Sequence, residues 1–74
     1  MKLCELRINQ KAIINFVDTS DLSALRLIEI GFSKGSEVEK VISGISKSLN
    51  AYKVKNTVVA LRNNTADNIK VSLI

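Results

Sequence analysis

Hydrophobic and polar positions alternate along much of this chain and divide it into short extended segments. Residues 11–17 carry five apolar side chains, three of them β-branched, and their period of two predicts a strand that is covered on both sides. In a second segment, residues 51–55, Tyr52 and Val54 are predicted to face inward and the alternating lysines outward. The same kind of pattern predicts further strands over residues 36–42, 57–62 and 69–73.

Residues 22–30 are predicted to form one short helix, because they follow a cluster of helix-capping residue types and end at a glycine. The candidate acceptors for the free N–H groups of the first turn are Asp18, Ser20 and Asp21. Gly31 is predicted to end the helix with a positive φ angle, which glycine adopts without steric cost. Phe32 is then placed to pack back on Leu27, as in a Schellman-type cap.

Polar and turn-forming residues mark the connections between these elements. Asn56 is predicted to turn a hairpin, since asparagine tolerates left-handed backbone well. Residues 43–44 and 46–50 are predicted to be the loosest part of the protein, and residues 63–67 a single helical turn. The whole order predicts a single domain, residues 1–74. Five short strands in so few residues bury one core by curling into a small, mostly β barrel.

Residue types that carry out catalysis are scarce. The chain of 74 residues has no histidine and one cysteine, Cys4, which excludes a His-dependent triad, a Cys/His zinc site and a disulfide within one chain. We therefore predict no enzyme activity, no catalytic residues and no cofactor. The lone cysteine, and the lack of a signal sequence or of an apolar run of about 20 residues, indicate a cytoplasmic protein that is not embedded in a membrane.

The remaining metal-ligating residue types form no convincing metal site. Ferrous iron prefers imidazole, thiolate or clustered carboxylates. Glu37 and Glu39 share one strand face, which is typical of a solvated surface. Asp18 and Asp21 flank the start of the helix, where a carboxylate caps the helix and meets its dipole. Cys4 is predicted to be a small buried apolar side chain. We therefore predict no metal site.

The positive charge is concentrated in the second half of the chain. Residues 1–39 carry a net charge of −1, and residues 40–74 a net charge of +5. Its positive charge could attract this half of the chain to nucleic acid, an acidic protein surface or lipid head groups. A simpler explanation of the charge is that lysines on exposed strands keep the protein soluble. Small barrels bind single strands through a basic groove with stacking aromatic side chains. The chain's aromatic residues are all expected in the core, which disfavours nucleic-acid binding: Phe16, Phe32 and Tyr52.

Three segments, in order, resemble FeoA-type ferrous iron transport proteins. Residues 25–38, LRLIEIGFSKGSEV, resemble the segment RLxELGhxxGxxV of that family. Its tail, hALRxxxAxxIxV, is matched by residues 59–62, Ala66 and residues 69–71. Its start is matched by Leu3, Leu6 and residues 12–14. The resemblance covers essentially the whole chain, and the departures from it are Asn9 and Asn56 in place of glycines and Leu49 near the usual proline.

The resemblance implies an SH3-like β-barrel of about five strands with one short helix inserted after the first strand. It also implies a cytoplasmic accessory protein of ferrous iron uptake that docks on the cytoplasmic domain of the FeoB-type ferrous iron transporter. Two alternatives remain open. One is a small basic nucleic-acid-binding barrel, and the other is a transition-metal-ion-binding module related to the C-terminal domain of metal-dependent repressors.

Helical geometry singles out one candidate docking surface. At about 100° per residue, one arc of the helix is predicted to face the barrel and contains Ala24, Leu25, Leu27 and Ile28. The opposite arc contains Leu22, Arg26, Glu29 and Ile30. Two apolar residues beside two opposite charges, on the segment most similar to the family, are predicted to dock on the transporter. The alternative is that loops from elsewhere cover Leu22.

Overall fold

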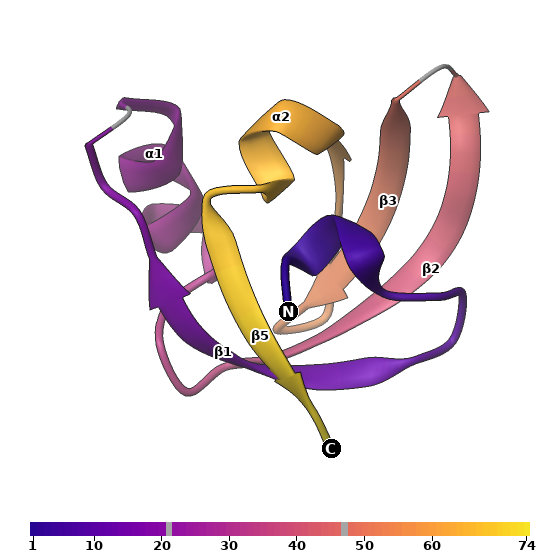
Figure 1. Ribbon diagram of the computed structural model, residues 1–74, viewed down its shortest axis with the longest axis horizontal. Helices are drawn as coiled ribbons and strands as arrows, with labels where there is room; N and C mark the ends of the chain where they lie inside the picture. The colour runs from indigo at the N-terminus through magenta and orange to yellow at the C-terminus, as the bar shows by residue number, and fades with distance from the viewer. Residues whose placement is uncertain (21, 47) are drawn as a thin grey trace.

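The computed structural model describes residues 1–20, 22–46 and 48–74, and these contain one antiparallel sheet of five strands in the order β4-β3-β2-β1-β5. The strands are β1 (Lys11–Val17), β2 (Glu37–Ser46), β3 (Leu49–Val54), β4 (Thr57–Arg62) and β5 (Ile69–Leu73). The helices are η1 (Leu3–Glu5, a 3-10 helix), α1 (Leu22–Ile30) and α2 (Asn63–Ala66). Figure 1 shows the sheet curved around a central core, with the N-terminus beside β5. The predicted mostly β barrel with one short helix after the first strand is confirmed.

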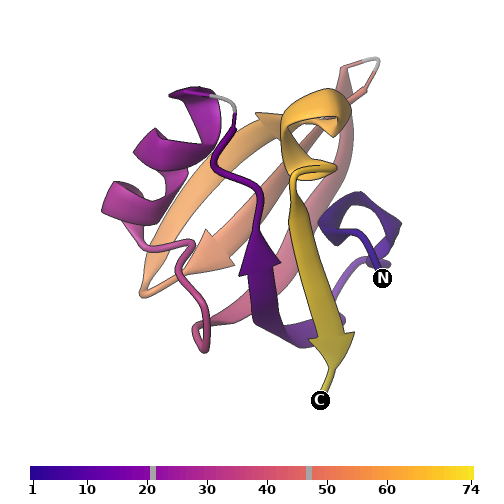
Figure 2. The same cartoon turned by 60° about the vertical axis from the view of Figure 1, so that its left-hand side comes forward.

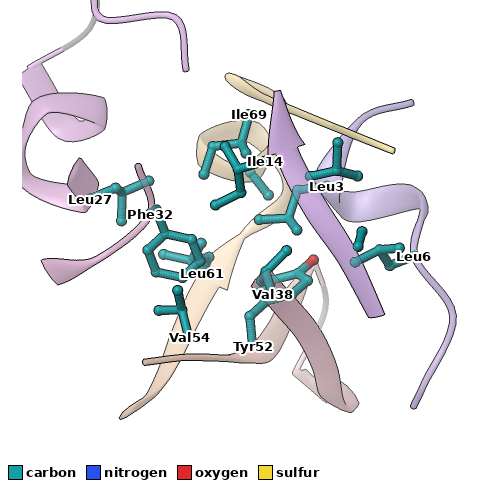
Figure 3. Close-up of a cluster of buried hydrophobic side chains, with 13 residues drawn as sticks. Leu3, Leu6, Ile14, Leu27, Phe32, Val38, Tyr52, Val54, Leu61 and Ile69 are labelled. Carbon is teal, nitrogen blue, oxygen red and sulfur yellow. The ribbon is translucent and has the colours of Figure 1, made fainter. Parts of the chain in front are cut away.

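The hydrophobic core lies inside the curved sheet. Its members come from η1, α1, α2 and every strand, so each element contributes apolar surface to one cluster (Figure 3). Tyr52 and Val54 face inward as predicted, and Lys53 and Lys55 are exposed. Burial of this shared surface supplies most of the stabilisation of a domain this small.

The β2–β3 hairpin is longer than the sequence pattern predicts. β2 continues to Ser46 and β3 begins at Leu49, so the prediction of a loose connection over this stretch is wrong for its described residues. Lys47 lies outside the described residues. The buried side chain of Asn50 holds the hairpin, because its Oδ1 accepts from the Gly44 N–H at 2.9 Å and its Nδ2 donates to Asn63 Oδ1 at 2.9 Å. The polar composition of this stretch predicts a loop, but the side chain of Asn50 finds its hydrogen-bond partners within the protein, so the stretch forms sheet.

Phe16 is exposed, which contradicts its predicted place in the core. Its alternation with Ala12 and Ile14 predicts that it faces inward, but the β1–β5 register shifts between Ile14 and Phe16. This β-bulge inserts an extra residue and reverses the facing of the residues after it. Val17, opposite the buried Ile69, packs against the core instead, and Phe16 is 56% exposed.

The end of α1 forms the predicted Schellman cap. The Phe32 N–H donates to the Leu27 carbonyl at 2.9 Å, the Gly31 N–H donates to the Ile28 carbonyl at 3.2 Å, and Gly31 has a φ of 137°. The side chains of Leu27 and Phe32 both belong to the core cluster (Figure 3). The cap therefore fixes the direction in which the chain leaves the helix.

The start of α1 is described only in part. The Asp18 carboxylate accepts from the Ser20 N–H at 3.0 Å, so it caps the turn that precedes the helix. This hydrogen bond is the main reason that the pKa of Asp18 lies below its usual range. Asp21, the other predicted carboxylate cap, lies outside the described residues.

The β3–β4 turn depends on a left-handed asparagine, as predicted. Lys55 and Asn56 have φ angles of 48° and 64°, the positive pair that a tight two-residue hairpin turn requires. We expect Asn56→Gly to be neutral or stabilising and Asn56→Val to cost about 1 kcal/mol or more in free energy of unfolding, measured by urea denaturation. Thr57→Val, in the extended strand next to the turn, is the control and should cost little. Equal stability of the valine and glycine variants at position 56 would contradict the assignment.

Candidate docking surface

One face of α1 is uncovered and carries all four of the predicted docking residues. Leu22 is 77% exposed and Ile30 is 44% exposed, with Arg26 and Glu29 exposed between them. Figure 2 shows α1 on one flank of the barrel, so that only one of its faces is directed at the strands. The alternative in which loops cover Leu22 does not occur in the described residues.

The exposed face of α1 is wider than helical geometry predicts. Leu25 is predicted to face the barrel but is 44% exposed, whereas Ala24 and Leu27 are buried and Ile28 is half-buried. The buried stripe therefore centres between Ala24 and Leu27. A nine-residue helix packed on a strongly curved sheet touches it along a narrow stripe, and residues at its border remain solvated. Sequence periodicity does not reveal the width of this contact.

Together these side chains form what we call the α1 surface: Leu22, Leu25, Arg26, Glu29 and Ile30. Leu22 and Leu25 are three positions apart and therefore neighbours on the helix, as are Arg26 and Glu29. The surface offers apolar contact area and one charge of each sign. An exposed apolar group of this kind, rimmed by charged residues, is typical of a protein–protein contact.

The only cysteine of the sequence, Cys4, is hydrogen-bonded to Asp67, the residue that follows α2. The Cys4 Sγ donates a hydrogen bond to Asp67 Oδ1 at 2.8 Å, and the side chain is half-buried rather than fully buried as predicted. Burial, with a smaller effect of the Asp67 carboxylate, raises the pKa of the Cys4 thiol to about 11. The thiol is therefore protonated at neutral pH, and thiolate is the form that binds metals.

A buried lysine lies beside Cys4, which the sequence pattern does not predict. Lys40 is 6% exposed, and its Nζ donates to the carbonyls of Cys4 at 3.2 Å and Leu6 at 2.8 Å. It also lies over the ring of Tyr52, 5.9 Å from the ring centroid. The Tyr52 hydroxyl is buried and has no hydrogen-bond partner among the described residues, and burial raises its pKa to about 12. Through its two hydrogen bonds to the carbonyls of Cys4 and Leu6, Lys40 anchors the N-terminal segment to the sheet.

The predicted carboxylate pair lies among lysines. Glu37 and Glu39 flank the buried Val38 and line a shallow groove of about 320 Å³ on the outer face of the sheet. The β-sheet register places Glu39 opposite Lys11 on one side and opposite Lys53 on the other. Within the described ranges, no group of three or more metal-ligating side chains comes together. The arrangement is a solvated surface of alternating charge.

We expect the isolated monomer to bind neither Fe²⁺ nor Zn²⁺ tightly, because its thiol is protonated and the carboxylates of the described residues are dispersed. Isothermal titration calorimetry of the purified chain should show no stoichiometric binding of sub-micromolar affinity. The Cys4→Ser variant is the matched control. Stoichiometric tight binding that Cys4→Ser abolishes would show that the thiol is a ligand after all.

A family comparison covers nearly the whole of this structure. The family model of the FeoA domain matches residues 1–73. The chain belongs to the FeoA family. The family resemblance of its sequence is thereby confirmed, and the α1 surface lies within the FeoA domain. In the described part of this FeoA chain, no helix is long and apolar enough to cross a membrane.

Solved FeoA structures share this fold. A zinc complex of Stenotrophomonas maltophilia FeoA, a procaryotic SH3 domain protein proposed as a bacterial ferrous iron transport activating factor, is 33% identical, with 97% of this chain and 89% of that chain covered and a TM-score of 0.84. Iron(II) transport protein A from Clostridium thermocellum is 29% identical, with 100% of this chain and 46% of that one covered and a TM-score of 0.87. The SH3-like barrel is thus confirmed.

The same fold also occurs in a different class of protein. A manganese-dependent transcriptional repressor is 16% identical, with 100% of this chain and 36% of that chain covered and a TM-score of 0.86. At this identity the likeness shows the fold alone. No curated protein sequence matches the chain.

Proposed function

We propose that this FeoA-family chain is a non-enzymatic, cytoplasmic accessory protein of ferrous iron uptake that docks through its α1 surface on the cytoplasmic domain of a FeoB-type transporter. The family match and the ferrous iron transport role proposed for the Stenotrophomonas maltophilia relative support the iron-uptake part. The uncovered apolar face of α1 supports the docking part, because Leu22, Leu25 and Ile30 are exposed together on one helix.

Docking in this form is driven by apolar burial and oriented by charge. Leu22 and Leu25 present adjacent aliphatic side chains, and complete burial of one leucine contributes about 1.5–3 kcal/mol. Arg26 and Glu29 lie beside them. A partner with an acidic group opposite Arg26 and a basic group opposite Glu29 would bind better than one without, and this charge complementarity adds specificity more than affinity. In this role the chain acts on the transporter by binding alone and catalyses no reaction.

The test is binding of the purified transporter cytoplasmic domain to variants of this chain by calorimetry. Leu22→Ser and Arg26→Glu are each expected to weaken binding about tenfold or more while leaving the melting temperature nearly unchanged. Val58→Ser is the matched control, because Val58 is 57% exposed on β4 and outside the α1 surface. That variant should bind like the unmodified chain.

Two outcomes would contradict the docking proposal. If Leu22→Ser lowers the melting temperature as much as Ile28→Ser does, Leu22 belongs to the packed structure and the surface does not exist. If the unmodified chain shows no saturable binding to the cytoplasmic domain, the transporter is not the partner of this surface.

A further inference from the structure

The outer surface of β1 and β5 carries an exposed aromatic ring beside two lysines. Phe16 is 56% exposed, and Lys70 lies directly opposite it in the β1–β5 register. Lys2 lies opposite Lys70 on the other side, in an antiparallel bridge. Opposite residues in such pairs share a face, with Cβ atoms about 4.5–5.5 Å apart. The three side chains therefore form one row, which we call the Phe16 row.

The Phe16 row brings two like charges together. Lys2 and Lys70 are both exposed, and like charges directly opposite each other destabilise a strand pair. Two carboxylates lie nearby, and each accepts a main-chain hydrogen bond: Glu5 from the Lys2 N–H at 2.7 Å and Asp18 from the Ser20 N–H at 3.0 Å. A hydrogen bond leaves the charge of each carboxylate in place, and Asp18 interacts electrostatically with Lys70. The two carboxylates therefore offset the charge of the row, and the attraction for an anion comes from the net charge of +4 on the whole chain.

We propose that the Phe16 row binds single-stranded nucleic acid, with one base stacked on Phe16 and two neighbouring phosphates held by Lys70 and Lys2, one by each lysine. A flat ring next to paired ammonium groups matches the alternation of base and phosphate along a strand. The net charge of +4 on the whole chain favours the encounter. The bulge in β1 makes this possible, because it turns outward the ring that the sequence pattern places in the core.

The polar surroundings of Phe16 favour a nucleic acid over a protein partner. Asn15 and Ser72 are exposed beside it, and the Asn15 amide donates a hydrogen bond to the Ser72 hydroxyl. A protein hot spot needs an apolar surface that seals the ring from water, and these neighbours do not supply one. The row also uses different elements from the α1 surface, so the two sites can be tested separately.

The test is fluorescence anisotropy of the full chain with a short labelled oligouridylate, repeated between about 50 and 200 mM salt. Two phosphate contacts predict a slope of log K against log salt of about −1.4, and Lys70→Gln should reduce it to about −0.7. Phe16→Ala should weaken binding about tenfold, because one base–aromatic stack is lost. Asp18→Asn should strengthen binding, and Lys53→Gln, outside the row, should leave it unchanged. An oligothymidylate arm shows whether RNA and DNA bind alike.

Three results would overturn the proposal. The first is an absence of saturable binding by the unmodified chain, and the second is unchanged affinity in Phe16→Ala. The third is competition by polyglutamate at the same concentration as oligouridylate, which would show that the row attracts any polyanion. All of the substituted side chains are exposed or at the border of the surface, and circular dichroism melting curves verify that each variant is folded.

Discussion

Replacing Phe32 by alanine is expected to lower the free energy of unfolding by about 3–5 kcal/mol. Phe32 is completely buried in the core cluster and follows Gly31 in the cap of α1. Its removal leaves a cavity next to Leu27 and takes away the apolar contact that anchors the end of the helix. Native domains have total stabilities of about 5–15 kcal/mol, so this one substitution would remove a large part of the stability of the chain.

Guanidinium denaturation followed by far-UV circular dichroism measures this loss. Phe16→Ala is the matched control, because it is the same substitution at a ring that is 56% exposed. That variant should lie within about 0.5 kcal/mol of the unmodified chain. Equal losses at the two positions would mean that the bulge in β1 does not turn Phe16 out of the core.

Substitution of Lys40 is the second large effect. Lys40→Met keeps an apolar stem but leaves the carbonyls of Cys4 and Leu6 without their buried donor, which is expected to cost about 1–3 kcal/mol. Lys40→Ala should cost about 1–2 kcal/mol more, because buried methylene groups contribute about 0.8 kcal/mol each. Urea denaturation of both variants separates the contribution of the charge from that of packing.

The result for Lys40→Met decides between two physical effects. A buried ammonium group pays a desolvation cost, and its hydrogen bonds offset that cost only when they are well formed. Lys53→Met is the control at an exposed lysine of β3 and should be nearly neutral. If Lys40→Met is as stable as the unmodified chain or more so, desolvation outweighs the two bonds, and Lys40 does not anchor the N-terminal segment.

The local sequence pattern was sufficient to predict the structure wherever neighbouring residues determine the backbone conformation. The bounds of β1, α1, β4 and β5 follow from alternation, helical periodicity and capping residues, and they agree with the structure. The positive φ angles of Gly31 and Asn56 follow from the same local logic, since few residue types occupy that region without strain. Helical periodicity likewise predicts that Leu22, Arg26, Glu29 and Ile30 face away from the barrel, and all four are exposed.

Long-range contacts decided the features that the pattern missed. Asn50 converts an expected loop into sheet because its partners, Gly44 and Asn63, come from two other elements. Lys40 is buried because carbonyls from the N-terminal segment reach it. Neither set of partners can be deduced from composition, because a polar side chain can form its hydrogen bonds with water as well as with the protein.

The facing of Phe16 and Leu25 shows the same division between sequence and tertiary structure. Alternation and helical geometry assign both to the interior, and both lie substantially in solvent. A one-residue bulge reverses one assignment, and the narrow contact of a short helix on a curved sheet reverses the other. The fold class, the element order and the exposure of Leu22, Arg26, Glu29 and Ile30 follow from the sequence, because they depend on local conformation and hydrophobic period. The final set of exposed apolar side chains depends on how the strands pair and how far the sheet curves, which only the assembled barrel determines.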